Sequence, residues 1–566
     1  MEEELQLYEP LFQGEPWSGR DALHLKPFVT NIDKSVYAPL IFSPELIGAL
    51  CSRASRAAQD LRAIFLNEFL YPFMYPVPEE DEAPESWAEK QKQSEALREF
   101  WMLLRKHGAI ELLQNPKARA FYLKWLAQYG DDSIAQMAGT HLVFCGLSQL
   151  AIKHLEDQRI GLAPIEKSTR YVDYSQKTGG QYLYFIDPTL AKMGLEKQYR
   201  AALDGLFSTY TKLLGKMQEW LSGKFPDEKP AVIRAKSFDV LRGLLPAATL
   251  SQVAFFGNGQ AFEYLYSRCA KHILGEVRWA GQRAYEELNQ VIPAFLRRAK
   301  TDIAKEYQEY LGNRKKRTAA LTKNLFNDNL PRSAQSVAVT LIEHDSEGEN
   351  KIVASMIYDT PGMRHSWSEI FEKVRSMPPD KKKQIVSKYF EGRTQRWQKV
   401  GRALENSFVR FEIVMNIGAW RDLHRHRMLT QQRQLFSVHH GYDVPSEVID
   451  AGLEKEFRGA ISQAEAVFSA IEAQDPEIAQ YAVPLAYRMR FQQWQNLRSF
   501  FWEAELRTIP EGHPDYRKIE QEKVRLIRKA FPLISQHLLA NMNQYDFARR
   551  GQDERIAQKE KDLLDK

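Results

Sequence analysis

The sequence predicts an α+β protein made of two tandem copies of one domain, each a small sheet packed by many long helices. The segment Gly194–Arg200 (GLEKQYR) recurs as Gly452–Arg458 (GLEKEFR). Both copies open long segments in which apolar residues return at helical spacing. Strand-like runs are few, which predicts only a small sheet in each half.

The spacing of proline, asparagine and arginine residues repeats in the same order. Pro246 is followed twelve positions later by Asn258, and Pro484 is followed twelve positions later by Asn496. Basic residues then recur at nearly equal distances from the two prolines: Arg268, Arg278, Arg507 and Arg517. Because several such matches occur in one order, we infer an internal duplication.

Composition places the boundary between the copies. The alternating β-branched run at 336–342 predicts a strand that opens the second copy. A polar turn follows it, and then an apolar run that fits a helix or a second strand. The predicted organisation is therefore a first domain at 1–312 with an acidic insertion near 77–86, a linker at 313–334 and a second domain at 335–566.

The bulk composition excludes several classes of protein. No apolar run approaches the roughly 20 residues of a membrane helix. The acidic N-terminus lacks the basic and apolar regions of a secretory signal. Three cysteines provide neither a disulfide framework nor a CxxC metal pair. We therefore expect a cytoplasmic protein with no membrane partner and no metal.

Two features bear on a nucleic-acid partner. The net charge of +5 is small for 566 residues and by itself predicts no such partner. The basic pentapeptide Asn313–Arg317 fits a phosphate or nucleic-acid patch, but a solvated linker or helix end is the better interpretation. Nucleic-acid binding therefore stays a distant alternative.

The second half carries a basic cluster centred on Arg425, His426 and Arg427. Planar guanidinium groups match pairs of phosphate oxygens and stay charged at any working pH, so the cluster suits an anionic ligand. The apolar run at 411–417 predicts a buried element that delivers such a loop. The plainer interpretation is a basic helix face that makes salt bridges.

The first half carries an irregular loop at 161–171, punctuated by glycine and proline. Ser168 offers a hydroxyl and Arg170 a bidentate cation, a pair that suits one phosphate monoester. Glu166 is placed to position a base or to bond neighbouring backbone. The plainer interpretation is a helix start that Ser168 caps.

Together these two segments resemble the two ends of one motif, R-H-R-x-x-S-x-N-E-x-S-x-R-Y, of the flavin-dependent thymidylate synthases. The first half, from 129 to 278, keeps the second end of the motif as Glu166, Ser168, Arg170 and Tyr171. At the R-H-R positions it has Gln158, Arg159 and Ile160.

The second half shows the opposite pattern of matches. It keeps the first end of the motif as Arg425, His426, Arg427 and a conservative Thr430. Where the family has Glu, Ser and Arg, it has Arg433, Leu435 and Ser437. The resemblance implies that the surviving R-H-R end holds the flavin and the neighbouring nucleotide.

Further positions extend the resemblance. Arg242 falls in the family's R-x-x-L-P, whose arginine binds the nucleotide, and the second copy has Gln480 there. Arg268 and Arg507 match the arginine thought to orient and activate the uracil ring, which makes them the catalytic candidates. Ser133 falls in the family's H-x-S-x-x-E-H, whose histidine appears in neither half. Ser133 and the remaining matches are taken as cofactor-binding; those matches are Asn258, Asn496, His272 and His513.

The resemblance implies a fold and an activity. The fold is two tandem synthase-like domains, each with a mostly antiparallel sheet. The activity is reductive methylation of dUMP to dTMP, with FAD, NADPH and 5,10-methylenetetrahydrofolate. Because family members place their sites between subunits, we expect hybrid sites: Glu166, Ser168, Arg170 and Arg242 for dUMP, and Arg425, His426 and Arg427 for flavin. A homodimer would rebuild a pseudo-tetramer.

Two other functions remain open from the sequence. The chain could be a degenerate homologue that binds a nucleotide or flavin and serves a structural or regulatory role. It could also be a flavoenzyme that modifies another pyrimidine nucleotide or uses another one-carbon donor.

Overall fold

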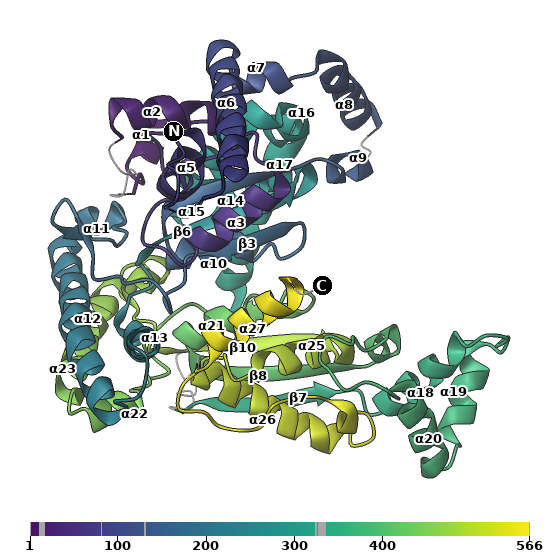
Figure 1. Cartoon of the computed structure of the whole chain (residues 1–566). Coiled ribbons are helices and arrows are strands. Elements are labelled where there is room, and N and C mark those ends of the chain that lie inside the picture. Colours follow the sequence, from purple (N-terminus) through teal and green to yellow (C-terminus); the bar gives the residue numbers. More distant parts are fainter. Residues whose placement is uncertain are drawn as a thin grey trace. The chain divides into compact units, whose positions relative to one another are not determined.

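The computed structural model describes residues 2–10, 17–80, 82–129, 132–322, 325, 336–548 and 550–564 (Figure 1). The chain divides into two compact units. Unit 1 consists of Met1–Thr211, Leu245–Pro331 and Gly459–Val483. Unit 2 consists of Lys212–Leu244, Arg332–Arg458 and Pro484–Lys566.

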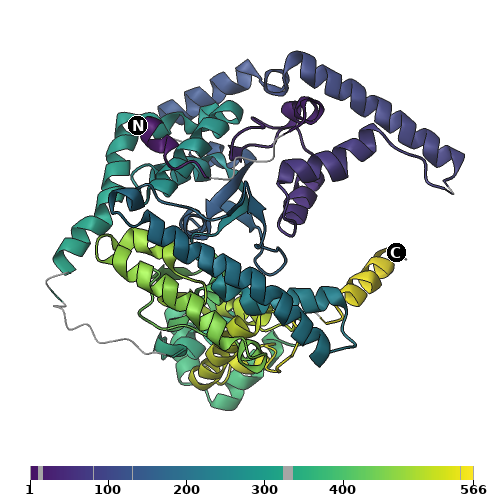
Figure 2. The same cartoon turned by 90° about the vertical axis from the view of Figure 1, so that its left-hand side faces the viewer.

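Each unit contains one segment from the other half of the sequence. Residues 212–244 of the first half belong to unit 2, and residues 459–483 of the second half belong to unit 1. Two long helices, α12 (Glu196–Lys224) and α23 (Glu454–Glu472), carry the chain into these segments (Figure 2). Within unit 2, Lys212 Nζ in the middle of α12 donates to Glu456 Oε1 at the start of α23, at 2.9 Å.

The sheet of unit 1 is antiparallel, in the order β1-β2-β6-β3. Its strands are β1 (Val36–Tyr37), β2 (Gly139–Ser148), β6 (Leu250–Asn258) and β3 (Leu162–Glu166). Pro164 lies in the edge strand β3, where a residue without an N–H costs the sheet least. A hairpin of β4 (Lys177–Thr178) and β5 (Gln181–Tyr182) lies apart from this sheet.

Helices cover the sheet of unit 1, and an apolar cluster that includes Leu25, Tyr37, Leu50, Phe65 and Val143 forms a core. The elements before β2 are α1 (Glu2–Gln6), α2 (Gly19–Leu25), η1 (Lys26–Phe28), α3 (Pro44–Ala54), α4 (Leu61–Ile64), η2 (Phe65–Leu70), α5 (Tyr71–Met74), α6 (Pro84–His107), α7 (Ala109–Leu113), α8 (Pro116–Tyr129) and α9 (Asp132–Gln136). The later elements are α10 (Gln149–Glu156), α11 (Thr189–Lys192), α14 (Gly259–Cys269), α15 (Gly275–Val291), α16 (Pro293–Leu296), η4 (Arg297–Lys300), α17 (Asp302–Thr322), α24 (Pro476–Ala479) and η6 (Gln480–Ala482).

The sheet of unit 2 repeats this architecture in the order β7-β8-β10-β9, again antiparallel. Its strands are β7 (Ala338–His344), β8 (Phe408–Asn416), β10 (Arg488–Asn496) and β9 (Thr430–Arg433). Its helical elements are α13 (Pro230–Leu241), η3 (Arg242–Leu244), α18 (Gly348–Tyr358), α19 (Trp367–Arg375), α20 (Pro379–Tyr389), η5 (Arg402–Asn406), α21 (Ile417–Leu423), α22 (Ser446–Asp450), α25 (Leu497–Arg507), α26 (Pro514–Ala530), η7 (Ser535–His537) and α27 (Gln552–Leu564).

The same junction from strand to helix occurs four times, twice in each unit. A central strand ends on a polar residue whose side chain accepts a hydrogen bond from the backbone N–H three residues later, which caps the next helix. The four caps are Ser148 (β2 to α10), Asn258 (β6 to α14), Asn416 (β8 to α21) and Asn496 (β10 to α25). Two of these caps fix the starts of α21 and α14, which border the two cavities described below.

The predicted α+β fold with two small antiparallel sheets is confirmed. Strand β7 lies at the predicted start of the second copy, and the following apolar run forms helix α18 rather than a strand. The run at 411–417 lies mostly in β8 and is buried as expected. The basic segment Asn313–Arg317 lies in α17 with its side chains largely exposed.

The structure also bears on the predicted linker, the acidic insertion, the cysteines and the absence of membrane helices. Most of the predicted linker, at 323–324 and 326–334, lies outside the described residues, as does Asp81 of the acidic insertion. The second half of that insertion begins helix α6 at Pro84. All three cysteines are buried in packed surroundings. Among the described residues, helices that could cross a membrane are absent.

Candidate functional site

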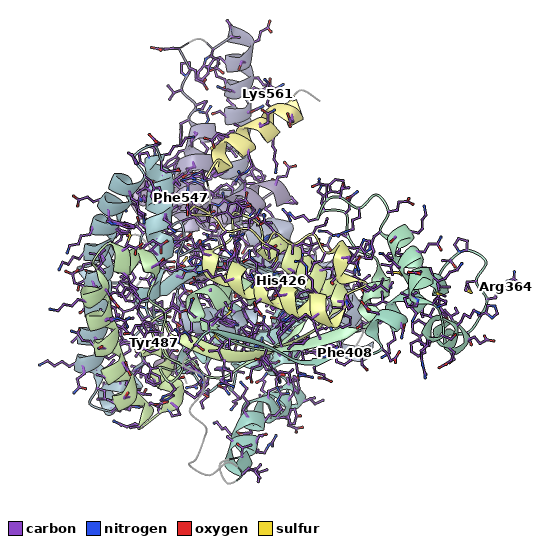
Figure 3. All side chains as sticks on the ribbon, turned by 90° about the horizontal axis from the view of Figure 1, so that it is seen from below. Arg364, Phe408, His426, Tyr487, Phe547 and Lys561 are labelled. Carbon is purple, nitrogen blue, oxygen red and sulfur yellow. The ribbon has the colours of Figure 1, made fainter. Side chains whose placement is uncertain are left out.

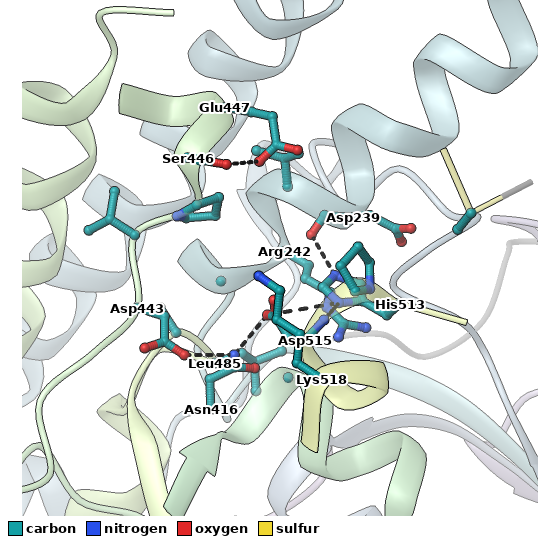
Figure 4. A pocket seen from close by; sticks show the side chains of 18 of the residues that line it. Asp239, Arg242, Asn416, Asp443, Ser446, Glu447, Leu485, His513, Asp515 and Lys518 are labelled. Atoms are coloured by element: carbon teal, nitrogen blue, oxygen red, sulfur yellow. Dashed lines mark hydrogen bonds and ion pairs between the residues drawn. The ribbon is translucent and has the colours of Figure 1, made fainter. Parts of the chain in front are cut away.

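Unit 2 contains a cavity of about 530 Å³ at the end of its central strands (Figure 4). Helix α13 and η3 line it together with the start of α21, the segment 443–447 and the start of α26. The basic side chains on its wall are Lys236, Arg242, Arg488, His513 and Lys518. The acidic side chains are Asp239, Asp443, Glu447 and Asp515. The wall therefore combines cations with hydrogen-bond acceptors around one space.

Arg242 reaches this cavity although it comes from the first half of the sequence. It follows α13 directly, in η3, and its side chain is buried. Its Nη1 lies 3.4 Å from Asp422 Oδ2 on α21. Gly418 permits this approach, because a Cβ there would lie 3.3 Å from Arg242 Nε. The guanidinium is thus held against the cavity wall.

Asn416 organises the acidic part of the wall. Its Oδ1 caps α21, and its Nδ2 donates to Asp443 Oδ2 at 2.9 Å and to Asp515 Oδ2 at 2.8 Å. Arg488 Nε donates to the other oxygen of Asp443 at 2.6 Å. Burial raises the pKa of the Asp515 carboxyl, but the Asn416 amide and the Arg242 guanidinium help to hold that pKa below its usual range. Asp515 is therefore an anionic acceptor.

His513 begins helix α26 at the edge of the cavity. Its Nδ1 accepts a hydrogen bond from the Asp515 N–H at 3.2 Å, so its Nε2–H donates to the Asp239 carbonyl oxygen, also at 3.2 Å. Two bonds thus fix the ring. Nearby, Lys236 is paired with Glu447, whereas the Lys518 side chain is exposed. The cations best placed to meet an incoming anion are Arg242 and Lys518.

The basic cluster of the second half forms a turn between α21 and β9, not the helix face of the plainer interpretation. Arg425 and Arg427 are exposed on the turn. His426, which is labelled in Figure 3, is buried. Arg507 Nε donates to His426 Nε2 at 2.7 Å, and burial lowers the pKa of His426 to about 3. The histidine is therefore a neutral support that ties this turn to α25.

Three fully buried charged side chains form a second cluster in this part of unit 2. Lys523 Nζ donates to Glu503 Oε2 at 2.9 Å and to Glu520 Oε1 at 2.8 Å, and each side chain is 0% exposed. Burial and the neighbouring Glu503 raise the pKa of Glu520 to about 7. Gln493 and Gln495 also donate to Glu503, at 2.6 and 2.9 Å. The hydrogen bonds of this cluster join the sheet to α25 and α26.

The equivalent turn of unit 1 has different chemistry. Gln158 Nε2 donates to the Ala261 carbonyl oxygen at 2.7 Å, and Ile160 is 66% exposed. Both line a second cavity of about 810 Å³, which Asn258 also borders. Arg268 Nη2 donates to the His154 carbonyl oxygen at 2.9 Å, near His272, whose pKa burial lowers to about 3.

The loop at 161–171 of unit 1 is more regular than predicted. Its first part forms strand β3, and Glu166 at its end is buried against Lys153 Nζ at 2.7 Å. Ser168 does not start a helix, because its Oγ accepts from the Arg170 N–H at 3.2 Å within a turn. Arg170 is itself largely buried. The plainer interpretation of this loop is therefore wrong.

Comparison with known proteins places the chain in a family. The model of the family described as thymidylate synthase complementing protein matches residues 80–294 and, separately, residues 340–533. The chain belongs to this family. The two separate matches also confirm the predicted tandem duplication.

Two relatives match most of the length of this chain. A UPF0159 protein of Chlamydia pneumoniae is 36% identical over 525 residues, which cover 90% of this chain and 92% of that protein. A UPF0159 protein of Thermoplasma acidophilum is 28% identical over 521 residues, covering 86% and 93%. A crystal structure of the UMP/dUMP methylase PolB from Streptomyces cacaoi, bound with 5-Br dUMP, matches 36% of this chain and 95% of its own at 14% identity, with a TM-score of 0.28.

Within this family member, the predicted site residues fall into three groups. Arg242 and His513 meet at the unit 2 cavity. Arg425, His426, Arg427, Thr430, Asn496 and Arg507 lie in unit 2 but do not line that cavity. Ser133, Glu166, Ser168, Arg170, Asn258, Arg268 and His272 belong to unit 1. A phosphate site shared by Ser168, Arg170 and Arg242 stays a prediction.

The structure adds cavity residues that the sequence reasoning did not select. These are Asn416, Asp443 and Asp515, together with Lys236. A signal for Asp515 was present, because Glu276 and Asp515 each lie two residues before a repeated arginine, Arg278 or Arg517. Asp443 carries no comparable signal, because its counterpart in unit 1 is Phe185: the N–H of each residue donates to the carbonyl oxygen two residues after the repeated proline, Ala486 or Ala248.

Proposed function

We propose that this chain is a nucleotide methyltransferase of the flavin-dependent thymidylate synthase type. The reaction converts dUMP, methylenetetrahydrofolate, NADPH and a proton to dTMP, tetrahydrofolate and NADP⁺. The observation that carries the proposal is the position of Arg242. The residue matching the family's nucleotide-binding arginine comes from the first half and lines a cavity otherwise formed largely by the second half.

The cavity has the chemistry that a nucleoside monophosphate requires. Arg242 and Lys518 supply cations for the phosphate, and a guanidinium fits two phosphate oxygens at once. Asp515 supplies an anionic acceptor for a hydroxyl or ring N–H, held in place by Asn416 at 2.8 Å. Holding the pyrimidine in one orientation is the contribution that the protein makes to such a transfer.

The turn at 425–427 fits a flavin dinucleotide by its donor set. Arg425 and Arg427 are exposed on a turn that His426 and Arg507 hold in place, and two such cations suit a diphosphate. In unit 1 the equivalent positions hold Gln158 and Ile160, which do not fit that group. A bound flavin supplies reducing equivalents to the transfer. A homodimer that forms a pseudo-tetramer stays a prediction.

The direct test is an assay of methyl transfer. The purified chain is mixed with FAD, NADPH, isotope-labelled methylenetetrahydrofolate and either dUMP or UMP, and labelled nucleotide is measured by mass spectrometry. We expect label in dTMP, and none when NADPH is left out. Label in the UMP product alone would favour a methyltransferase for another pyrimidine nucleotide. Binding of dUMP without any product in complete mixtures would favour the degenerate homologue.

Measuring flavin affinity tests the assignment of the turn at 425–427 to flavin binding. Replacing Arg427 with alanine removes one exposed charge-assisted contact, so we expect flavin affinity to fall about 10-fold, as measured by fluorescence titration. The matched control is Ile160→Ala at the equivalent position of unit 1, which we expect to leave the affinity unchanged. The assignment is wrong if Arg427→Ala has no effect while Ile160→Ala abolishes flavin binding.

A further inference from the structure

The position of Gly243 in unit 2 has an exact structural counterpart in unit 1. In unit 2 the Ala486 N–H donates to the Gly243 carbonyl oxygen at 2.9 Å. In unit 1 the Ala248 N–H donates in the same way to the Tyr481 carbonyl oxygen at 3.1 Å. Gly243 and Tyr481 each lie three residues before the repeated proline. The two positions are therefore equivalent, and a tyrosine in one unit replaces a glycine in the other.

The surrounding residues correspond in the same way. Ser148 ends β2 and caps α10, as Asn416 ends β8 and caps α21. Glu276 is the second residue of α15, as Asp515 is the second residue of α26. In each unit the capping residue donates a hydrogen bond to this carboxylate. Unit 1 thus contains the same pair of capping residue and carboxylate that lines the unit 2 cavity.

In unit 1 the side chain of Tyr481 fills the space beside this carboxylate. Its hydroxyl donates to Glu276 Oε2 at 2.8 Å, and Tyr481 and Glu276 are 0% and 1% exposed. Its ring packs against Phe185, with the ring centroids 4.9 Å apart. In unit 2 the counterparts of Tyr481, Ser148 and Glu276 are Gly243, Asn416 and Asp515, and all three line the 530 Å³ cavity. A phenol therefore occupies in unit 1 the space that unit 2 leaves for a ligand.

The residue beside the phenol has also changed. Gln480 replaces the Arg242 cation, and its Nε2 donates to the Glu477 carbonyl oxygen at 3.1 Å and to Glu477 Oε2 at 2.9 Å. Burial raises the pKa of Glu276 to about 7, and Ser148 bonds both of its oxygens, at 2.6 and 2.8 Å. In unit 1, Gln480 and Glu276 therefore both have hydrogen-bond partners within the protein. At the same place unit 2 has the Arg242 cation beside a cavity.

We infer that Tyr481 is an internal ligand that permanently fills the unit 1 counterpart of the nucleotide cavity, so that each chain binds one nucleotide and not two. The count of one rests on the proposed function, since it assumes that the unit 2 cavity takes dUMP. The internal ligand itself rests only on the hydrogen bonds, ring contact and burial in unit 1.

The first experiment is the stoichiometry of dUMP binding to the full chain by isothermal titration calorimetry. We expect one dUMP per chain, and that site is lost in Arg242→Ala but kept in Gln480→Ala. Two dUMP per chain would overturn the inference while leaving the proposed function intact. If dUMP does not bind at all, the proposed function fails, and the second experiment alone decides the inference.

The second experiment removes the Tyr481 side chain by mutation and adds a small phenol in solution to replace it. Tyr481→Gly opens the space, and p-cresol, which carries the tyrosine ring and hydroxyl, should raise the melting temperature of this variant by at least about 2 °C. Toluene, which lacks the hydroxyl, should raise it less, because only p-cresol can donate to Glu276. Wild type and Tyr481→Phe serve as controls in which the space stays filled. Equal response of all three proteins to p-cresol would overturn the inference.

Discussion

Replacing Arg242 with alanine is expected to weaken dUMP binding roughly 100-fold, the equivalent of about 3 kcal/mol. The guanidinium is buried at the cavity wall, and phosphate bound there would lose its charge-assisted hydrogen bonds. Calorimetric titration with dUMP measures the change. Steady-state assays of methyl transfer should show the same loss in kcat/KM.

Two variants make this result specific. Arg242→Lys keeps the charge but not the planar fork, so affinity should recover only in part. Gln480→Ala alters the equivalent position of the other copy and should leave affinity within about twofold of wild type, because unit 1 contributes no open cavity there. If Gln480→Ala weakened binding as much as Arg242→Ala, the nucleotide would not be held by the unit 2 cavity as proposed.

Replacing Lys523 with methionine is expected to lower the free energy of unfolding by about 3–5 kcal/mol. The change leaves Glu503 and Glu520 together in a site where all three side chains are 0% exposed. Two carboxylates without their cation cannot both stay charged there. Urea denaturation followed by circular dichroism measures the effect, with the transition of each unit fitted separately if they unfold apart.

The matched control for this prediction is Lys212→Met. Lys212 also pairs with a glutamate, Glu456, at 2.9 Å, but both side chains are substantially exposed, so the loss should stay below about 1 kcal/mol. A similar small loss for Lys523→Met would show that water reaches the buried cluster. The idea that this cluster stabilises unit 2 would then be wrong.

The sequence predicted the parts of the fold that depend on local pattern and repetition. The repeated segments at 194–200 and 452–458 revealed the duplication because they are copies of one helix start. The alternating run near 338 predicted β7 because side chains in a strand alternate between faces. Arg242 was selected because a short motif surrounds it. Each of these signals lies within a few neighbouring residues.

The local sequence pattern could not predict that segments 212–244 and 459–483 are exchanged between the units. The apolar face of α12 predicts that the helix is packed, but apolar contacts carry no direction that would identify the partner. Tyr481 gave no signal either, since a tyrosine in an apolar stretch is most often ordinary core. Its meaning depends on Glu276, which lies 205 residues away in the sequence.

The crossing of residues 212–244 and 459–483 into opposite units means that neither half of the sequence forms a unit by itself. A split within the segment 313–334 would give two proteins, each lacking a helical stretch of the body that it mainly forms. The two halves of the sequence therefore cannot be separated without removing part of each unit.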